Sequence, residues 1–167
     1  KRQMENSDEY SENSDEYSEN SHEYSNKYKL GLALTTGDEN QIIQALRTCM
    51  AQDKNDIKLD AHGIRNSGAI RLAFALTNGN LPDIRTMDLY DDKIEKDGII
   101  AIAEALPHCS ISDLSLTHND IGYEGAIAIA RSLPKASKLT RLEMIHCQLT
   151  TDGVIAIVEA LPHCNIS

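Results

Sequence analysis

Five apolar or glycine positions recur with the same spacing four times along this 167-residue chain. Within each copy the successive positions are separated by two, five, four and eight residues, while the distance between copies varies only from 27 to 30 residues. Such agreement indicates tandem structural units that stack on one another. The copies are Ile57, Leu59, Ile64, Gly68 and Leu76; Met87, Leu89, Ile94, Gly98 and Leu106; Leu114, Leu116, Ile121, Gly125 and Leu133; and Leu142, Met144, Leu149, Gly153 and Leu161.

Each copy is expected to form a short strand, a turn and a helix. In Met87-Asp88-Leu89 two apolar residues flank a polar one, which is the period of a strand. After Gly98 the apolar residues follow the i, i+3, i+4 and i+7 spacing of an amphipathic helix, which Pro107 ends. The predicted helical stripes are Ala69, Leu72, Ala73 and Leu76; Ile99, Ile102, Ala103 and Leu106; Ala126, Ile129, Ala130 and Leu133; and Val154, Ile157, Val158 and Leu161.

The third copy carries the segment Ile111-x-x-Leu114-x-Leu116-x-x-Asn119-x-Ile121, and the fourth has Cys147 where the third has Asn119. This pattern resembles the leucine-rich repeat, and the resemblance covers about residues 54–167. The helices resemble those of the ribonuclease-inhibitor class, which also occurs in innate-immune receptors and in GTPase activators for Ran. The resemblance implies an α/β solenoid, with a curved parallel sheet inside and helices outside. It also implies a structural role for Cys147 in bonding the turn backbone.

The chain is expected to have three parts. Residues 1–28 contain an acidic heptapeptide repeat with one tyrosine in each heptad, so they are predicted to be a disordered tail. Residues 29–53 are predicted to be an N-terminal helical cap or a degenerate repeat, with a helix from Glu39 to Ala51. Residues 54–167 hold the four repeats and, because Ile166 restarts the pattern, the beginning of a truncated fifth.

The strand residues that point away from the core are the predicted partner-binding site. Tyr90 and Ile145 are candidate anchors, while Asp88 and Glu143 are candidates to pair with lysine or arginine. The alternative is that these are only solvated strand residues. The predicted concave residues are Lys58, Asp60, Asp88, Tyr90, Asp113, Ser115, Thr117, Arg141, Glu143 and Ile145, with Asp56 and Thr86 at the strand starts and Asp91, His118 and His146 beside them.

On the convex side, Phe74 occupies a position that is Glu104, Arg131 or Glu159 in the other copies, so an exposed ring is expected there. Either the Glu39–Ala51 helix or its loop packs over this ring, which we favour, or the ring belongs to a second binding site.

No motif for catalysis, cofactor binding or metal binding is found. The pairs His108-Cys109 and His163-Cys164 lie two repeats apart, roughly 20 Å by the spacing of packed layers, too far to share a zinc ion. The net charge of −10 disfavours nucleic acid and anionic membranes as partners. The cysteines form no paired motif, and free thiols indicate a cytoplasmic protein.

The predicted function is therefore a non-catalytic protein–protein interaction module, or scaffold, whose partner is a basic or mixed-charge protein. The resemblance leaves two alternatives, a regulator of a small GTPase and the ligand-sensing region of an immune-type receptor.

Overall fold

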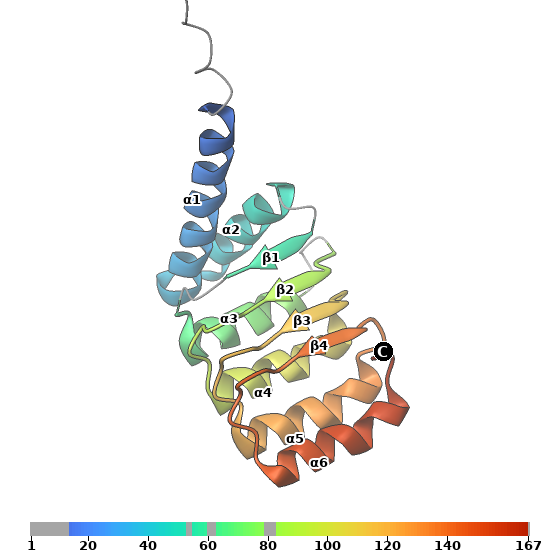
Figure 1. Ribbon diagram of the computed structural model, residues 1–167. Coiled ribbons are helices and arrows are strands. Elements are labelled where there is room, and N and C mark those ends of the chain that lie inside the picture. The colour runs from blue at the N-terminus through green and yellow to red at the C-terminus, as the bar shows by residue number, and fades with distance from the viewer. Residues whose placement is uncertain (1–13, 53–54, 60–62, 79–82, 167) are drawn as a thin grey trace, which may run out of the picture.

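Four short strands and a layer of helices form the body of the computed structural model, which describes residues 14–52, 55–59, 63–78 and 83–166. The strands are β1 (Asp56–Lys58), β2 (Thr86–Asp88), β3 (Asp113–Ser115) and β4 (Arg141–Glu143), all parallel and in chain order. The helices are α1 (Ser14–Thr36), α2 (Glu39–Gln52), α3 (Arg65–Thr77), α4 (Lys96–Ala105), α5 (Gly122–Ser132) and α6 (Thr151–Ala160). Figure 1 shows the strands stacked in one layer and the helices in another.

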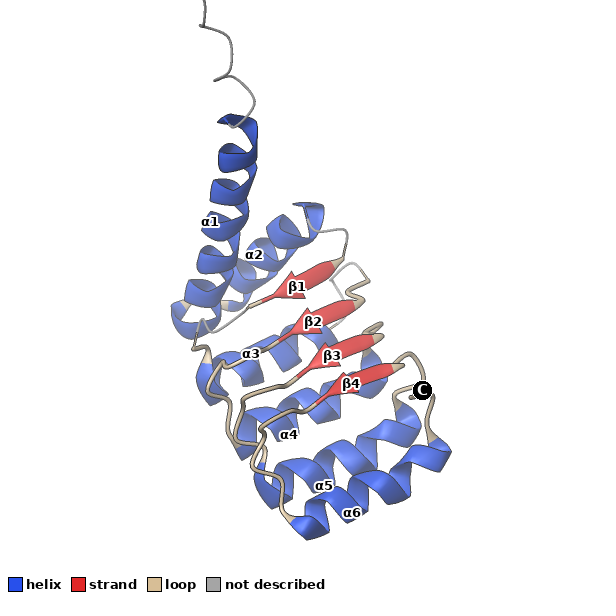
Figure 2. Cartoon of the chain, in the orientation of Figure 1, coloured by secondary structure: helices blue, strands red, loops and turns tan. Residues whose placement is uncertain are grey.

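The strand register follows the sequence repeat. Ile57 pairs with Met87, Met87 with Leu114, and Leu114 with Leu142, so the first position of every copy aligns across the sheet. These central residues point into the core, and the first three of them are almost completely buried. Figure 2 shows all the strands on one face of the stack with helices on the other, which confirms the predicted α/β solenoid.

The helical stripes predicted for the first three copies are buried between the sheet and neighbouring helices. Small residues permit this packing: a Cβ added to Gly98 would lie 2.5 Å from Cγ2 of Ile94 and 2.9 Å from Cβ of Ala69 in the preceding helix. Each of the last three helices continues into a 3-10 turn that contains the proline, at Leu106–His108, Leu133–Lys135 and Leu161–His163. Each of these helices therefore ends in a tighter 3-10 turn at its proline, before the chain continues to the next strand.

Buried polar side chains in the turns after β3 and β4 form hydrogen bonds to the preceding repeat. Oδ1 of Asn119 accepts from the backbone N–H of Ile94 at 2.9 Å, and its amide nitrogen donates to the carbonyl of Leu89 at 2.6 Å. In the next copy the thiol of Cys147 donates to the carbonyl of Leu116 at 3.1 Å. These bonds connect adjacent repeats, so Cys147 has the structural role that the resemblance implied.

The N-terminal end of the stack is covered by α1 and α2. The apolar side chains Leu30 and Leu34 of α1 are fully buried, as is Leu46 of α2, and all three belong to the continuous core. The predicted cap thus begins with the last turns of α1, and α2 matches the helix expected from Glu39 to Ala51.

The beginning of α1 differs from the expected tail. Residues 14–28 belong to this helix, whereas a disordered segment was predicted through residue 28; residues 1–13 lie outside the described part of the chain. Leu30 and Leu34 provide the physical reason, because their burial anchors the last turns. Helix formation then propagates more easily than it nucleates, so polar residues upstream can continue the same helix.

The C-terminal end of the stack is an open edge. Val154, Val158 and Leu161 of the last copy are 43%, 56% and 38% exposed, whereas the matching residues of the earlier copies are buried. The difference arises because each repeat buries its stripe against the next one. The predicted fourth stripe therefore forms with the right register but without a covering layer.

Candidate functional site

The polar strand residues form rows across the outer face of the sheet. The parallel register aligns Lys58, Asp88, Ser115 and Glu143 in one row. The row before it contains Asp56, Thr86, Asp113 and Arg141. Asp60, the remaining carboxylate predicted on this surface, lies outside the described residues. We call the described members of these rows, together with Tyr90 and Ile145, the concave face.

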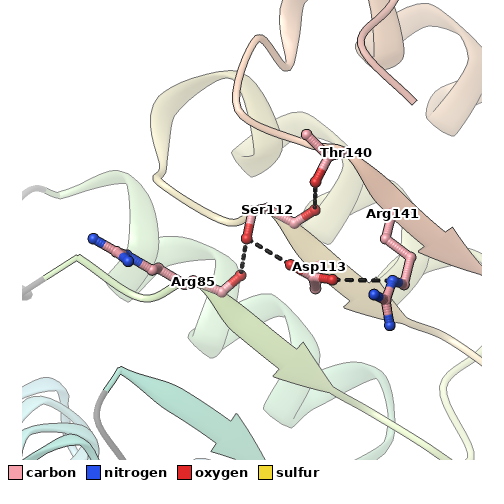
Figure 3. Close-up of polar contacts among 5 residues, drawn as sticks. All are labelled: Arg85, Ser112, Asp113, Thr140 and Arg141. Atoms are coloured by element: carbon pink, nitrogen blue, oxygen red, sulfur yellow. Dashed lines mark hydrogen bonds and ion pairs between the residues drawn. The ribbon is translucent and has the colours of Figure 1, made fainter. Parts of the chain in front are cut away.

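One charged pair of the concave face is already satisfied internally. Nε of Arg141 lies 3.1 Å from Oδ1 of Asp113, and the other carboxylate oxygen accepts from the hydroxyl of Ser112 at 2.6 Å (Figure 3). The Ser112 hydroxyl also contacts the carbonyl of Arg85 at 3.2 Å, and Thr140 repeats this bond onto Ser112 at 3.1 Å. These contacts connect three consecutive repeats. Asp113 and Arg141 are therefore less available to a partner than their sequence positions suggested.

Thr117 has a structural role, although the sequence suggested an exposed binding residue at this position. Its side chain is buried, and its hydroxyl accepts a hydrogen bond from the backbone N–H of Ile145 at 3.3 Å. The reason is that the threonine side chain reaches the adjacent repeat and satisfies a backbone donor there. A partner covering the sheet would therefore contact this residue only slightly.

Tyr90 and Ile145 are accessible, at 39% and 58% of their surface. Tyr90 follows β2, and its backbone N–H donates to Oδ1 of Asp88 at 3.1 Å. This bond holds the carboxylate of Asp88 beside the start of the turn that carries the tyrosine. The two predicted anchors are thus exposed large apolar side chains on the same sheet face.

Two histidines extend the surface of Tyr90 along the stack. The ring of Tyr90 meets His118 edge-on with centroids 5.1 Å apart, and His118 lies 4.8 Å from His146. We call these three residues the aromatic row. His118 and His146 occupy the same place in successive repeats, both with positive φ, and both are exposed. The signal was present in the sequence, because both follow the central strand residue by four positions, but a contact between their rings was not predicted.

Three carboxylates on or beside the concave face have no ion-pair partner within the described part of the chain. Among the residues that the structure describes, Asp88, Asp91 and Glu143 form no salt bridge. Asp91 has the same position in its repeat as His118 and His146, and its backbone N–H donates to the carbonyl of Thr117 at 3.0 Å. The concave face therefore combines exposed rings with negative charge that is not neutralised internally.

The convex side carries a separate apolar groove of about 350 Å³ between α2 and α3. Phe74 borders it and remains 53% exposed, as the register predicted. Ile42 and the Gly37–Asp38 loop form the opposite wall, so α2 lies beside the ring and covers it only in part. Arg71 reaches across and donates to the carbonyl of Gly37.

The described part of the chain contains no group of three or more histidine, cysteine or acidic side chains arranged to hold a metal ion. All four cysteines are free, and burial raises the pKa of the Cys109 and Cys147 thiols. Among the helices described, none has the length and apolar character needed to span a membrane.

Comparison with known families agrees with this geometry. The family described as Leucine Rich repeat matches residues 108–130 and 135–158, which contain the turns of Asn119 and Cys147. The chain contains leucine-rich repeats. The match lies in its third and fourth repeats, where the pattern is most regular, and the register described above extends the same unit back to β1.

Two known proteins are similar to this chain. It is 24% identical over 142 residues to the human protein "NACHT, LRR and PYD domains-containing protein 5", and the match covers 81% of this chain but only 11% of that relative. Among solved structures, "Leiomodin-1 Actin-Binding Site 2 (ABS2)" superposes with a TM-score of 0.61 and 19% sequence identity. That alignment covers 81% of this chain and 72% of the other, and it establishes a shared fold.

Proposed function

We propose that this leucine-rich repeat chain is a non-catalytic protein-interaction module that binds a protein partner on its concave face. The observation that carries the proposal is the exposure of Tyr90 and Ile145 on a sheet face whose other residues are polar. Large side chains of this kind lose the most water when a partner covers them, and aromatic residues are frequent at the energetic centres of protein interfaces.

The charge of the concave face supports a basic or mixed-charge partner. Asp56, Asp88 and Glu143 have no salt bridge within the described residues, while Arg141 already neutralises Asp113. Lys58 is the basic residue of this face that adds positive charge without such a pair. Complementary charge on a partner would increase its association rate and disfavour acidic competitors.

The leiomodin structure supports the class of function, since a protein of similar fold is named as an actin-binding site. Actin is therefore one defined protein with which the proposal can be tested directly. Co-sedimentation of the chain with purified actin filaments, at low and physiological salt, measures whether this partner is shared. Binding that disappears in a Tyr90→Ala variant would place actin on the concave face.

A pull-down comparison tests the concave face for any partner. Immobilised chain with Tyr90→Ala and Asp88→Asn is compared with the native chain, and Glu104→Gln on the exposed side of α4 is the matched control. Proteins retained by the native chain and by the control, but lost with the double variant, support the proposal. Retention of the same proteins at the same level by all three would remove it.

The non-catalytic part of the proposal has its own test. We expect that the chain leaves the rate of GTP hydrolysis by purified small GTPases unchanged. A reproducible stimulation of hydrolysis, dependent on chain concentration, would favour the alternative of a GTPase regulator.

A further inference from the structure

The aromatic row is a continuous exposed surface made by successive repeats. Tyr90 contacts His118 and His118 contacts His146, with centroid distances of 5.1 and 4.8 Å. The backbone fixes this arrangement, because the N–H of His118 donates to the carbonyl of Ile145 at 2.8 Å, directly before His146. The rings thus project from turns whose backbones are hydrogen-bonded across adjacent repeats.

Two carboxylates border the tyrosine end of this row. Asp88 is held close to Tyr90 by the hydrogen bond from the tyrosine N–H at 3.1 Å, and Asp91 is the next residue after the tyrosine. Neither forms a salt bridge with another described residue. An exposed π surface and unneutralised negative charge therefore lie at the same place.

The exposed rings and the carboxylates together determine which side chain of a partner can bind here. An anionic group is disfavoured by the carboxylates. A purely aliphatic side chain would cover the rings but would leave the carboxylates partly desolvated without a partner, which costs free energy. Arginine satisfies both features, because its planar guanidinium stacks on aromatic faces and donates two parallel hydrogen bonds to a carboxylate. Lysine supplies the charge without the planar, bidentate geometry.

We propose that the aromatic row, with Asp88 and Asp91, is a recognition site for an arginine side chain of the protein partner. The inference rests on the proposed concave-face function and specifies the chemistry of its anchor. The guanidinium lies over the ring of Tyr90, beside His118, and its N–H groups face the two carboxylates. Specificity for arginine over lysine then follows from geometry, and the pairing with the carboxylates weakens with salt.

The test uses N-acetyl-arginine amide as the probe and the full ¹⁵N-labelled chain as the receptor. Backbone amide shifts are followed by NMR up to a probe concentration of tens of millimolar, since a single side chain binds weakly. N-acetyl-lysine amide controls for charge, and N-acetyl-citrulline amide controls for shape without charge. We expect saturable shifts at Tyr90, Asp91, His118 and His146 with arginine, and an affinity for lysine at least about threefold lower.

Two variants locate the site without disturbing the backbone. Asp88→Asn with Asp91→Asn removes the charge but keeps side-chain shape, and we expect the arginine affinity to fall about three- to tenfold. His118→Asn removes a ring while retaining a residue type that tolerates the positive φ of 61°. Glu104→Gln is the matched surface control and leaves the titration unchanged.

The outcomes separate this inference from the function on which it rests. Absence of saturable shifts, or equal affinity for arginine and lysine, overturns arginine recognition even if the pull-down confirms the concave face. Arginine binding at the row combined with an unchanged pull-down overturns both the concave-face function and the role of this site in it. Arginine-selective shifts lost in the variants, together with a partner lost in the pull-down, support both.

Discussion

The imidazole rings of His118 and His146 lie with their centroids 4.8 Å apart, although the two residues are separated by a complete repeat. The distance equals the spacing of adjacent strands, because equivalent positions of stacked repeats are neighbours across the sheet. Side chains at the same position of successive repeats therefore form a row along the stack. Buried polar groups form one such row at Asn119 and Cys147, and the accessible rings form another.

The buried row predicts a large effect at Asn119. Replacement by alanine leaves the N–H of Ile94 and the carbonyl of Leu89 without their partner in a region closed to water. We expect Asn119→Ala to lower the free energy of unfolding by about 3 kcal/mol. Urea denaturation followed by circular dichroism measures the change, because the chain contains no tryptophan.

Asn165→Ala is the matched control for that variant. Asn165 is exposed and donates a hydrogen bond to the carbonyl of Ser137, so its loss is expected to cost less than about 0.5 kcal/mol. Equal effects of the two substitutions would contradict the structural role assigned to the buried row.

Close contact between helices predicts the result at Gly98. Alanine is normally the better helix former by about 1 kcal/mol. Here its Cβ would lie 2.5 Å from Ile94 and 2.9 Å from Ala69, so we expect Gly98→Ala to destabilise the chain by about 1–3 kcal/mol net. Gly122→Asn is the control, since that site is open and its φ of 62° is one that asparagine tolerates. Stabilisation by Gly98→Ala would show that α3 and α4 are farther apart than described.

Most of the fold could be predicted from the sequence, because the recurring apolar positions mark the residues that pack into the core. The spacing of the copy at Leu114 identified a strand, a turn and a helix, and the structure has β3 and α5 at those places. The upstream end of α1 was not predicted. Its residues 14–28 are polar and lack an apolar period, while the helix that contains them depends on Leu30 and Leu34 farther along the chain.

The candidate site was predicted less completely, since the register gives the direction of a side chain but not what it touches. Tyr90 and Ile145 are exposed as expected. Thr117 shares their register, yet its hydroxyl binds the backbone N–H of Ile145 and the side chain is buried. The salt bridge between Asp113 and Arg141 could have been predicted from the sequence, because the two residues are paired directly across β3 and β4.

Burial of Cys147 predicts a dependence of stability on pH. Desolvation raises the pKa of its thiol above the ordinary value of a cysteine, so the folded state retains the neutral form at a pH where the unfolded chain ionises. The stabilisation from this group is complete below the unfolded pKa and is lost as pH rises through the folded value. The stability difference between the native chain and Cys147→Ala is therefore expected to shrink between pH 7 and pH 10.

Unfolding in urea at both pH values measures that difference. Ser137→Ala, an exposed and non-titrating change, is expected to keep a constant difference from the native chain. A difference for Cys147→Ala that stays constant or grows with pH would contradict the assigned burial.

The open edge predicts opposite outcomes for one substitution at two equivalent positions. Ala103 in α4 and Val158 in α6 both follow their glycine by five residues, but they are 1% and 56% exposed. We expect Ala103→Glu to cost at least about 3 kcal/mol, because a carboxylate is placed between helices without a partner. Val158→Glu places the same group in solvent and is expected to change stability by less than about 1 kcal/mol. Measured by urea denaturation, a large loss in Val158→Glu would show that α6 is covered in solution.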